Sequence, residues 1–131
     1  MIGAALCQRV NNKLVVIEYA SRSLADSEKH YTATEKECLG MKWAAERWRL
    51  YLLAAPTTFR TAVRMDKMHE VDMDNDSAPA TTDSEQPHVT FQTDHSALTS
   101  LQRKRVINNS RLAHWITTMA EFDYTVEYLP V

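Results

Sequence analysis

Three acidic residues lie where the chain is expected to change direction. Glu35 and Glu37 are in the stretch YTATEKECLG at residues 31–40, and Asp94 is in TFQTDHSAL at residues 90–98. Carboxylates that a fold brings together can hold a hard divalent cation such as Mg²⁺. The same residue types also cap helices and form turns. The three residues are therefore either the remains of a metal-binding active site or ordinary cap and turn residues.

The local sequence offers a structural explanation for each of them. Thr34-x-x-Glu37 and Thr32-x-x-Glu35 both match a capping box, in which the glutamate accepts a hydrogen bond from the N–H of the capping residue. From these residues alone, capping is favoured over metal binding for Glu37. In the same way, Asp94 alone predicts an N-cap for a helix at 96–103.

Several other kinds of site are not expected. The only glycines are Gly3 and Gly40, which excludes a glycine-rich phosphate loop. The histidines show no spacing typical of a zinc site. Cys7 and Cys38 form no CxxC pair and lie in apolar stretches, so we expect reduced core residues of an intracellular protein.

Length and composition predict one domain with one core. The chain has 131 residues, is 44% hydrophobic and has a net charge of −2, so it resembles neither a basic nucleic-acid tail nor an acidic arm. No apolar run is long enough to span a membrane, and the N-terminus lacks the basic start of a signal peptide. We therefore expect an intracellular protein that is neither secreted nor membrane-bound.

The N-terminal part predicts a β-hairpin followed by a long helix. Residues 2–8 and 14–24 are expected to be strands, and Asn11-Asn12 suits the turn between them. A helix should start near 32–34 and run to about Leu53. Its apolar residues recur every three or four positions and predict one buried stripe. The stripe consists of Cys38, Met41, Ala45, Trp48 and Leu52.

Residues 56–88 differ in character from the rest. Pro56 ends the helix, and the range 66–85 contains seven acidic residues against one lysine. Such a segment is typical of a disordered insertion. A solvated linker is favoured over a partner-binding tail.

Regular structure is expected to resume at residue 88. A strand is predicted at 88–93, and a helix follows within 108–123, capped by Asn109 or Ser110. A last strand is predicted at 124–130. This order indicates an α/β layer fold, with 1–55 and 89–131 as two parts of one domain around the 56–88 insertion.

These segments together resemble a known family. IGAALCQ, IEYASRSLADSEKHYTATEKECLGMKWAAERWRLYL, TDHSALTSL and SRLAHWITTMAEFDYTVEYLP are similar, in the same order, to the RNase H domain of gypsy-type LTR retrotransposon reverse transcriptases. The resemblance covers most of the chain outside 56–88.

The resemblance implies a ribonuclease H-like fold, a five-stranded mixed sheet with helices on its faces. Members of the family cleave the RNA strand of RNA–DNA hybrids during reverse transcription. They use two Mg²⁺ ions held by four carboxylates, because two hard cations about 3.5–4 Å apart must flank the scissile phosphate.

The resemblance assigns two of these ligands. Glu37 in KECLG matches the helix-borne glutamate, and Asp94 in TDH matches the aspartate after the fourth strand. Glu35 is not expected to be a ligand. The family's first aspartate precedes the IGA motif and its fourth carboxylate follows the last strand, so neither is expected in this chain.

The missing first strand has a structural consequence, because it is central in the family's sheet. The hairpin and the strand at 88–93 would then pair directly or stay apart, leaving backbone groups without partners. We therefore expect marginal stability and little or no nuclease activity.

Nucleic-acid contacts are also implied. Arg103, Lys104 and Arg105 form a basic cluster that is either a solvated loop or a contact to the phosphates of the hybrid. His95 is expected to position or pack rather than to catalyse. Trp48 and Trp115 lie on apolar stripes, which favours core packing over base stacking.

The leading hypothesis is thus a reverse transcriptase RNase H fragment of a retrotransposon polyprotein, with the rest of the polyprotein and an RNA–DNA hybrid as partners. The alternative is a non-catalytic module that binds nucleic acid or protein. A decayed gene product is a third hypothesis.

Overall fold

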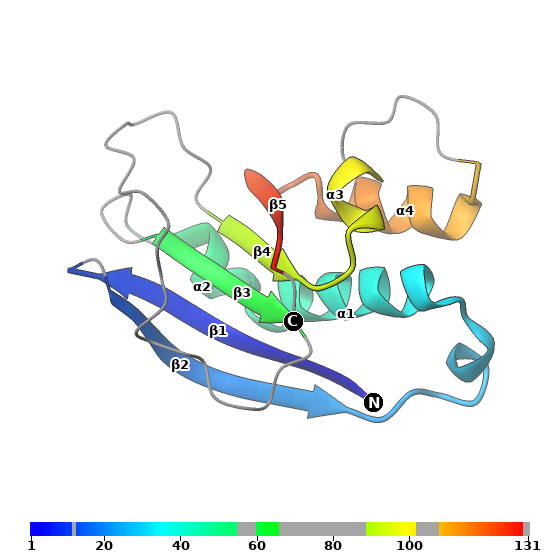
Figure 1. Ribbon diagram of the computed structural model, residues 1–131, viewed down its shortest axis with the longest axis horizontal. Coiled ribbons are helices and arrows are strands. Elements are labelled where there is room, and N and C mark those ends of the chain that lie inside the picture. The colour runs from blue at the N-terminus through cyan, green and yellow to red at the C-terminus, as the bar shows by residue number, and fades with distance from the viewer. Residues whose placement is uncertain (12, 55–59, 66–88, 102–107, 130–131) are drawn as a thin grey trace.

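The computed structural model describes residues 1–11, 13–54, 60–65, 89–101 and 108–129 (Figure 1). The elements in chain order are β1 (Ile2–Val10), β2 (Lys13–Arg22), the 3-10 turn η1 (Glu28–His30), α1 (Ala33–Arg47), α2 (Arg49–Ala54), β3 (Arg60–Met65), β4 (Val89–Thr93), α3 (Ala97–Leu101), α4 (Ser110–Met119) and β5 (Tyr124–Tyr128). The predicted hairpin, long helical region and C-terminal elements are confirmed, and β3 is new.

The hairpin forms as the sequence predicts. β1 pairs antiparallel with β2 from Ile2 opposite Arg22 to Val10 opposite Lys13, with a register shift at Leu6/Cys7. Asn11 has φ of 51°, a left-handed conformation that asparagine tolerates better than most residues.

The described strands form one mixed sheet in the order β2-β1-β3-β4-β5. β3 pairs antiparallel with β1 and parallel with β4, and β4 pairs parallel with β5. The expectation that the sheet lacks a central strand is therefore wrong, since β3 lies between the hairpin and β4. The backbone groups of β1 and β4 that were expected to lack partners pair with β3.

The interpretation of 56–88 as disordered is wrong for residues 60–65. Val63 and Met65 face the core formed with the helices, while Ala62 faces a second cluster on the opposite side of the sheet. A strand covered on both faces has a continuous small or apolar pattern rather than a strict alternation. The remainder of 56–88 lies outside the described residues.

Helices α1 to α4 contribute to the same core on one face of the sheet, together with β1, β3 and β4. The predicted stripe of the long helix is buried, and so are Leu112, Trp115, Met119 and Phe122 of the α4 region. The long helix divides at Trp48 into α1 and α2.

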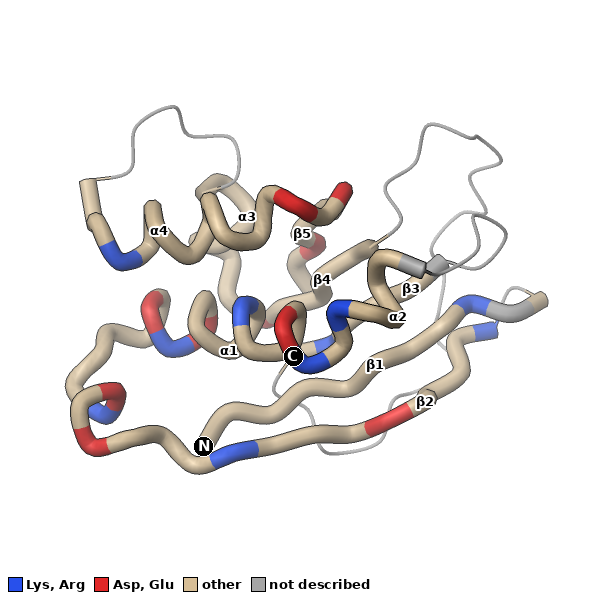
Figure 2. Tube along the Cα trace, turned by 180° about the vertical axis from the view of Figure 1, so that it is seen from behind, with Lys and Arg blue, Asp and Glu red and all other residues tan. Residues whose placement is uncertain are grey.

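Figure 2 shows charges of both signs along α1 and few along β1.

A smaller apolar cluster lies on the opposite side of the sheet and contains Ala5, Cys7, Leu14 and Ala62. Cys7 and Cys38 are both free and buried, as predicted. Burial raises the pKa of the Cys7 thiol to about 11 and that of Cys38 to about 12, which keeps both thiols protonated and unreactive.

Candidate active site

A cavity of about 350 Å³ lies where the ends of three strands meet the start of α1. It is bounded by the start of β1, the end of β3, the residues after β4 and the first two turns of α1. Its lining residues are Met1, Ile2, Gly3, Leu24, Ala33, Lys36, Glu37, Gly40, Met65, Asp94 and His95. The structure thus brings together Glu37 and Asp94, the two site residues predicted from sequence, although 57 positions separate them.

The capping box at the start of α1 contains Glu35 and not Glu37. Thr32 is the N-cap of α1, its hydroxyl accepts from the Glu35 N–H at 3.1 Å, and Glu35 Oε1 accepts from the Thr32 N–H at 3.1 Å. The capping box is therefore Thr32-x-x-Glu35, and the alternative box formed by Thr34 and Glu37 is not adopted. Glu37 lies in the second turn and is not the capping residue.

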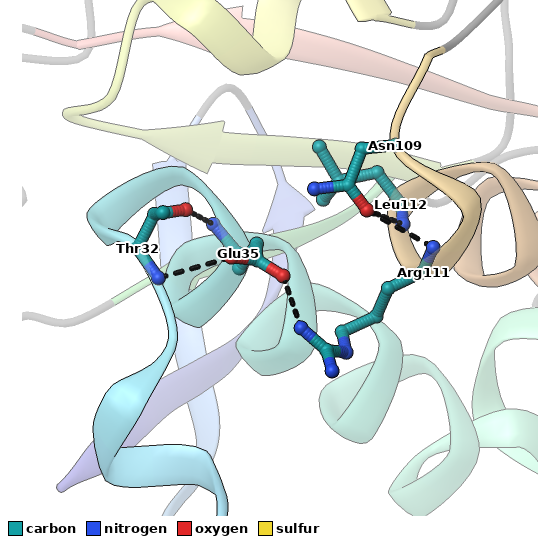
Figure 3. Close-up of polar contacts among 5 residues, drawn as sticks. All are labelled: Thr32, Glu35, Asn109, Arg111 and Leu112. Atoms are coloured by element: carbon teal, nitrogen blue, oxygen red, sulfur yellow. Dashed lines mark hydrogen bonds and ion pairs between the residues drawn. The ribbon is translucent and has the colours of Figure 1, made fainter.

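Glu35 also accepts a hydrogen bond from Arg111 of α4 (Figure 3). Its side chain is only 7% exposed. The Thr32 N–H, followed by the Arg111 guanidinium, lowers the pKa of the Glu35 carboxyl to about 2.

Glu37 is held by the end of β4. Thr93 Oγ1 donates to Glu37 Oε1 at 2.8 Å, and the same hydroxyl accepts from the His95 N–H at 3.1 Å. Thr93 is buried, so its hydroxyl gives the Glu37 carboxylate a fixed donor. This contact holds the Glu37 carboxylate against the last residue of β4, which directly precedes Asp94 in the chain.

His95 connects the same loop to α1. Its Nε2 and Thr34 Oγ1 share a hydrogen bond of 2.8 Å. The histidine thus ties the segment after β4 to the first turn of the helix that bears Glu37. This agrees with the expectation that His95 positions neighbouring groups.

Asp94 is partly buried and lies between β4 and α3. The helix predicted at 96–103 begins at Ala97, and its described part ends at Leu101. The first amides of that turn bond to backbone oxygens, Leu98 N to His95 O and Thr99 N to Ser96 O. Asp94 lines the cavity at the carboxyl end of a parallel strand, where α/β sheets commonly bind ligands.

Among the described residues, the cavity has two carboxylates, Glu37 and Asp94. In the part of the chain that the structure describes, no group of three or more His, Cys, Asp or Glu residues is arranged to hold a metal. Two carboxylates on one cavity match the way proteins commonly hold Mg²⁺, which keeps several waters or takes phosphate oxygens as further ligands.

Sequence reasoning did not single out three residues that line this cavity or contact the start of α1 or Glu37. Thr93 belongs to the TDH motif but was not singled out, although a threonine beside the aspartate was the available signal. Lys36 lines the cavity next to Glu37. Arg111 lies in the quoted SRLAHW stretch, but nothing in the sequence predicted its contact with Glu35. The basic cluster of Arg103, Lys104 and Arg105 lies outside the described residues.

The fold and the site together define a class of protein. A mixed five-stranded sheet, an α1 helix across it, and carboxylates from that helix and from the end of β4 on one cavity constitute a ribonuclease H-like α/β domain.

A family model described as the RNase H-like domain found in reverse transcriptase matches residues 1–77. The chain belongs to this family. Glu37 lies inside the matched range, whereas Asp94 and Arg111 lie beyond it. Domains of this family are in general dependent on divalent metals.

The chain is also similar to the retrovirus-related Pol polyprotein from transposon 412 of Drosophila melanogaster, with 27% identity over 127 residues. The alignment covers 97% of this chain but only 8% of that polyprotein. Within the described residues, no helix is long and apolar enough to cross a membrane.

Proposed function

We propose that the chain is the RNase H-like part of a gypsy-type retrotransposon Pol polyprotein, acts inside the cell, and binds RNA–DNA hybrids at the Glu37–Asp94 cavity. The observation that supports this most strongly is the convergence of these two carboxylates, from α1 and from the end of β4, on one cavity. The family match and the similarity to a Pol polyprotein support the nucleic-acid context.

Glu37 and Asp94 would hold a single Mg²⁺ ion in this cavity. A bound ion would neutralise and polarise a phosphate oxygen of the nucleic-acid backbone. Thr93 fixes one oxygen of Glu37, and Lys36, on the cavity wall, supplies a positive charge for a neighbouring phosphate.

Hybrid cleavage by this chain is proposed to be weak or absent. The family mechanism requires two ions that flank the scissile phosphate, and so more than two carboxylates. Glu37 and Asp94 are the only carboxylates among the described cavity-lining residues. Their site therefore suits metal-assisted binding better than rapid hydrolysis.

Fluorescence anisotropy with a labelled RNA–DNA hybrid tests the proposal. We expect salt-dependent binding that Mg²⁺ strengthens, and loss of the Mg²⁺ effect in Glu37→Gln and Asp94→Asn. Asp123→Asn is the matched control, since Asp123 is exposed and its backbone oxygen bonds Val89 at the opposite end of β4. No hybrid binding at low salt would refute the binding role, and rapid hybrid cleavage would refute the proposed inactivity.

A protein-binding module is the second candidate function. Three apolar side chains on α2 are well exposed, namely Leu50, Tyr51 and Leu53. Because the chain spans about 8% of the related polyprotein, other parts of such a polyprotein are the candidates for covering this face. Binding of adjacent polyprotein segments that Leu50→Asp abolishes, with no hybrid binding, would favour this function.

A further inference from the structure

The start of α1 is held from two sides. Glu35 and Glu37 are two residues apart, so their side chains leave the helix about 200° apart around its axis. Glu37 contacts Thr93 of β4, whereas Glu35 contacts Arg111 of α4 (Figure 3). The rotation of this part of α1 about its own axis is therefore restrained on one side by β4 and on the other by α4.

On the α4 side, several contacts fix the position of Arg111. The Arg111 guanidinium lies 4.1 Å from the centroid of the Tyr31 ring, and Tyr31 packs against Trp115 with ring centroids 5.8 Å apart. Asn109 caps α4 by accepting from the Arg111 and Leu112 amides, which fixes the backbone from which Arg111 extends. The guanidinium thus meets both an aromatic face and a carboxylate in defined positions.

We propose that Arg111 is a positioning residue for Glu37. Its ion pair with Glu35 sets the rotation of the start of α1, and that rotation directs the Glu37 carboxylate to Thr93 and into the cavity beside Asp94. The inference rests on the proposed function, because a role for Glu37 as a metal ligand gives this positioning its purpose. The family match ends at residue 77, so Arg111 lies beyond the residues that it covers.

A second ion pair, between α2 and the residues just after α4, provides a matched comparison. Arg49 donates to Glu121 just beyond the opposite end of α4, and both side chains are about half exposed. Exposed pairs of this kind contribute little to stability. In contrast, loss of Arg111 leaves the buried Glu35 carboxylate with the Thr32 N–H of its capping box, so the first turn must shift to find water or another donor.

Mg²⁺ titration by calorimetry on folded protein separates positioning from general stabilisation. Arg111→Met keeps much of the side-chain length and removes the charge, and we expect it to weaken Mg²⁺ binding about tenfold, as for other partners that orient a ligand. Arg111→Lys should restore part of the affinity. Arg49→Met should bind Mg²⁺ like the unchanged protein. Equal effects of Arg111→Met and Arg49→Met would overturn the inference.

A metal-free measurement keeps the inference testable if the unchanged protein binds no Mg²⁺, a result that would refute only the proposed function. Urea unfolding of Arg111→Met, Thr93→Val and the double variant measures whether the two sides of α1 are coupled. Each variant changes the unfolding equilibrium constant by some factor. We expect the factor for the double variant to differ at least about threefold from the product of the factors for the two single variants. Additive effects would overturn the positioning role. If Arg111→Met does not fold, Arg111→Lys takes its place in the same comparison with Thr93→Val.

Discussion

Thr93 Oγ1 donates a hydrogen bond of 2.8 Å to Glu37 Oε1 and so joins the last residue of β4 to the second turn of α1. The two residues are 56 positions apart in sequence. Their contact brings the helix-borne carboxylate to the strand end that Asp94 follows. The proposed metal site depends on this junction, because neither element alone provides two carboxylates to the cavity.

Thr93→Val should destabilise the protein. The substitution keeps the shape of the side chain but removes a buried hydroxyl that donates to Glu37 and accepts from the His95 N–H. Loss of a hydrogen bond to a charged group costs about 1.5–3 kcal/mol. Urea unfolding measures the loss, with the exposed Thr125→Val of β5 as control. Equal stability of both variants would show that the hydrogen bond contributes nothing.

Gly40 should tolerate alanine much better than leucine. A Cβ at this position would lie 2.9 Å from Met65 Cε and 3.1 Å from Ile2 Cγ2. The Met65 methyl is the end of a flexible side chain, and alanine improves helix propensity by about 1 kcal/mol, so Gly40→Ala should be nearly neutral. Gly40→Leu overpacks the junction of α1 with β1 and β3, with an expected loss of about 1–3 kcal/mol. Thermal unfolding of the two variants checks the difference, and a leucine variant as stable as the alanine variant would contradict it.

Acid should remove stability that Glu35 contributes. The folded-state pKa of Glu35 is lowered to about 2 by the Thr32 N–H and Arg111, below its ordinary value of 4.5. A lowered folded-state pKa means that the contribution is complete above the unfolded pKa and is lost as pH falls from about 4.5 toward 2. Unfolding free energies of Glu35→Gln should therefore depend less on pH in this window than those of the unchanged protein.

Glu28 provides an internal comparison for this pH dependence. Its pKa is also lowered to about 2, first by the Arg22 side chain and then by the Ala25 N–H. Glu28→Gln should reduce the same acid-dependent slope, and the double variant should reduce it further because the two sites are separate. An unchanged slope in Glu35→Gln would contradict the lowered pKa.

β3 should be as protected from hydrogen exchange as its neighbours. Thr61 to Val63 are buried in the middle of the sheet, with β1 on one side and β4 on the other. Amides of a central strand open only with large unfolding events, so those of Arg60–Met65 should exchange as slowly as those of β1. Exchange within the dead time would support the original interpretation of residues 60–65 as part of a disordered segment.

Much of the fold was predictable because its signals are local. The helix stripe from Cys38 to Leu52, the Asn11 turn and the Asn109 cap each depend on a few neighbouring residues, and all are confirmed. β3 was missed because a short buried strand has little periodicity, and the acidic run that follows it dominates the composition of 56–88.

The site was predictable only in part, because only some of its signals are local in sequence. Glu37 and Asp94 lie in recognisable motifs, and the structure places both on one cavity. The choice of Thr32-x-x-Glu35 over Thr34-x-x-Glu37 as capping box depends on where the helix starts, and two matching patterns close together could not decide that. The Arg111–Glu35 contact joins residues 76 positions apart and is a property of the tertiary packing alone.

Mg²⁺ titration of the unchanged chain, Glu37→Gln, Asp94→Asn and Asp123→Asn is the most direct measurement of the central claim. We expect one bound ion in the unchanged chain and at least about tenfold weaker binding in each of the first two variants, because each removes one of two carboxylate ligands. Asp123→Asn, at the opposite end of β4, should bind like the unchanged chain. Absence of Mg²⁺ binding, or equal affinity in all three variants, would contradict the claim that Glu37 and Asp94 form a metal site.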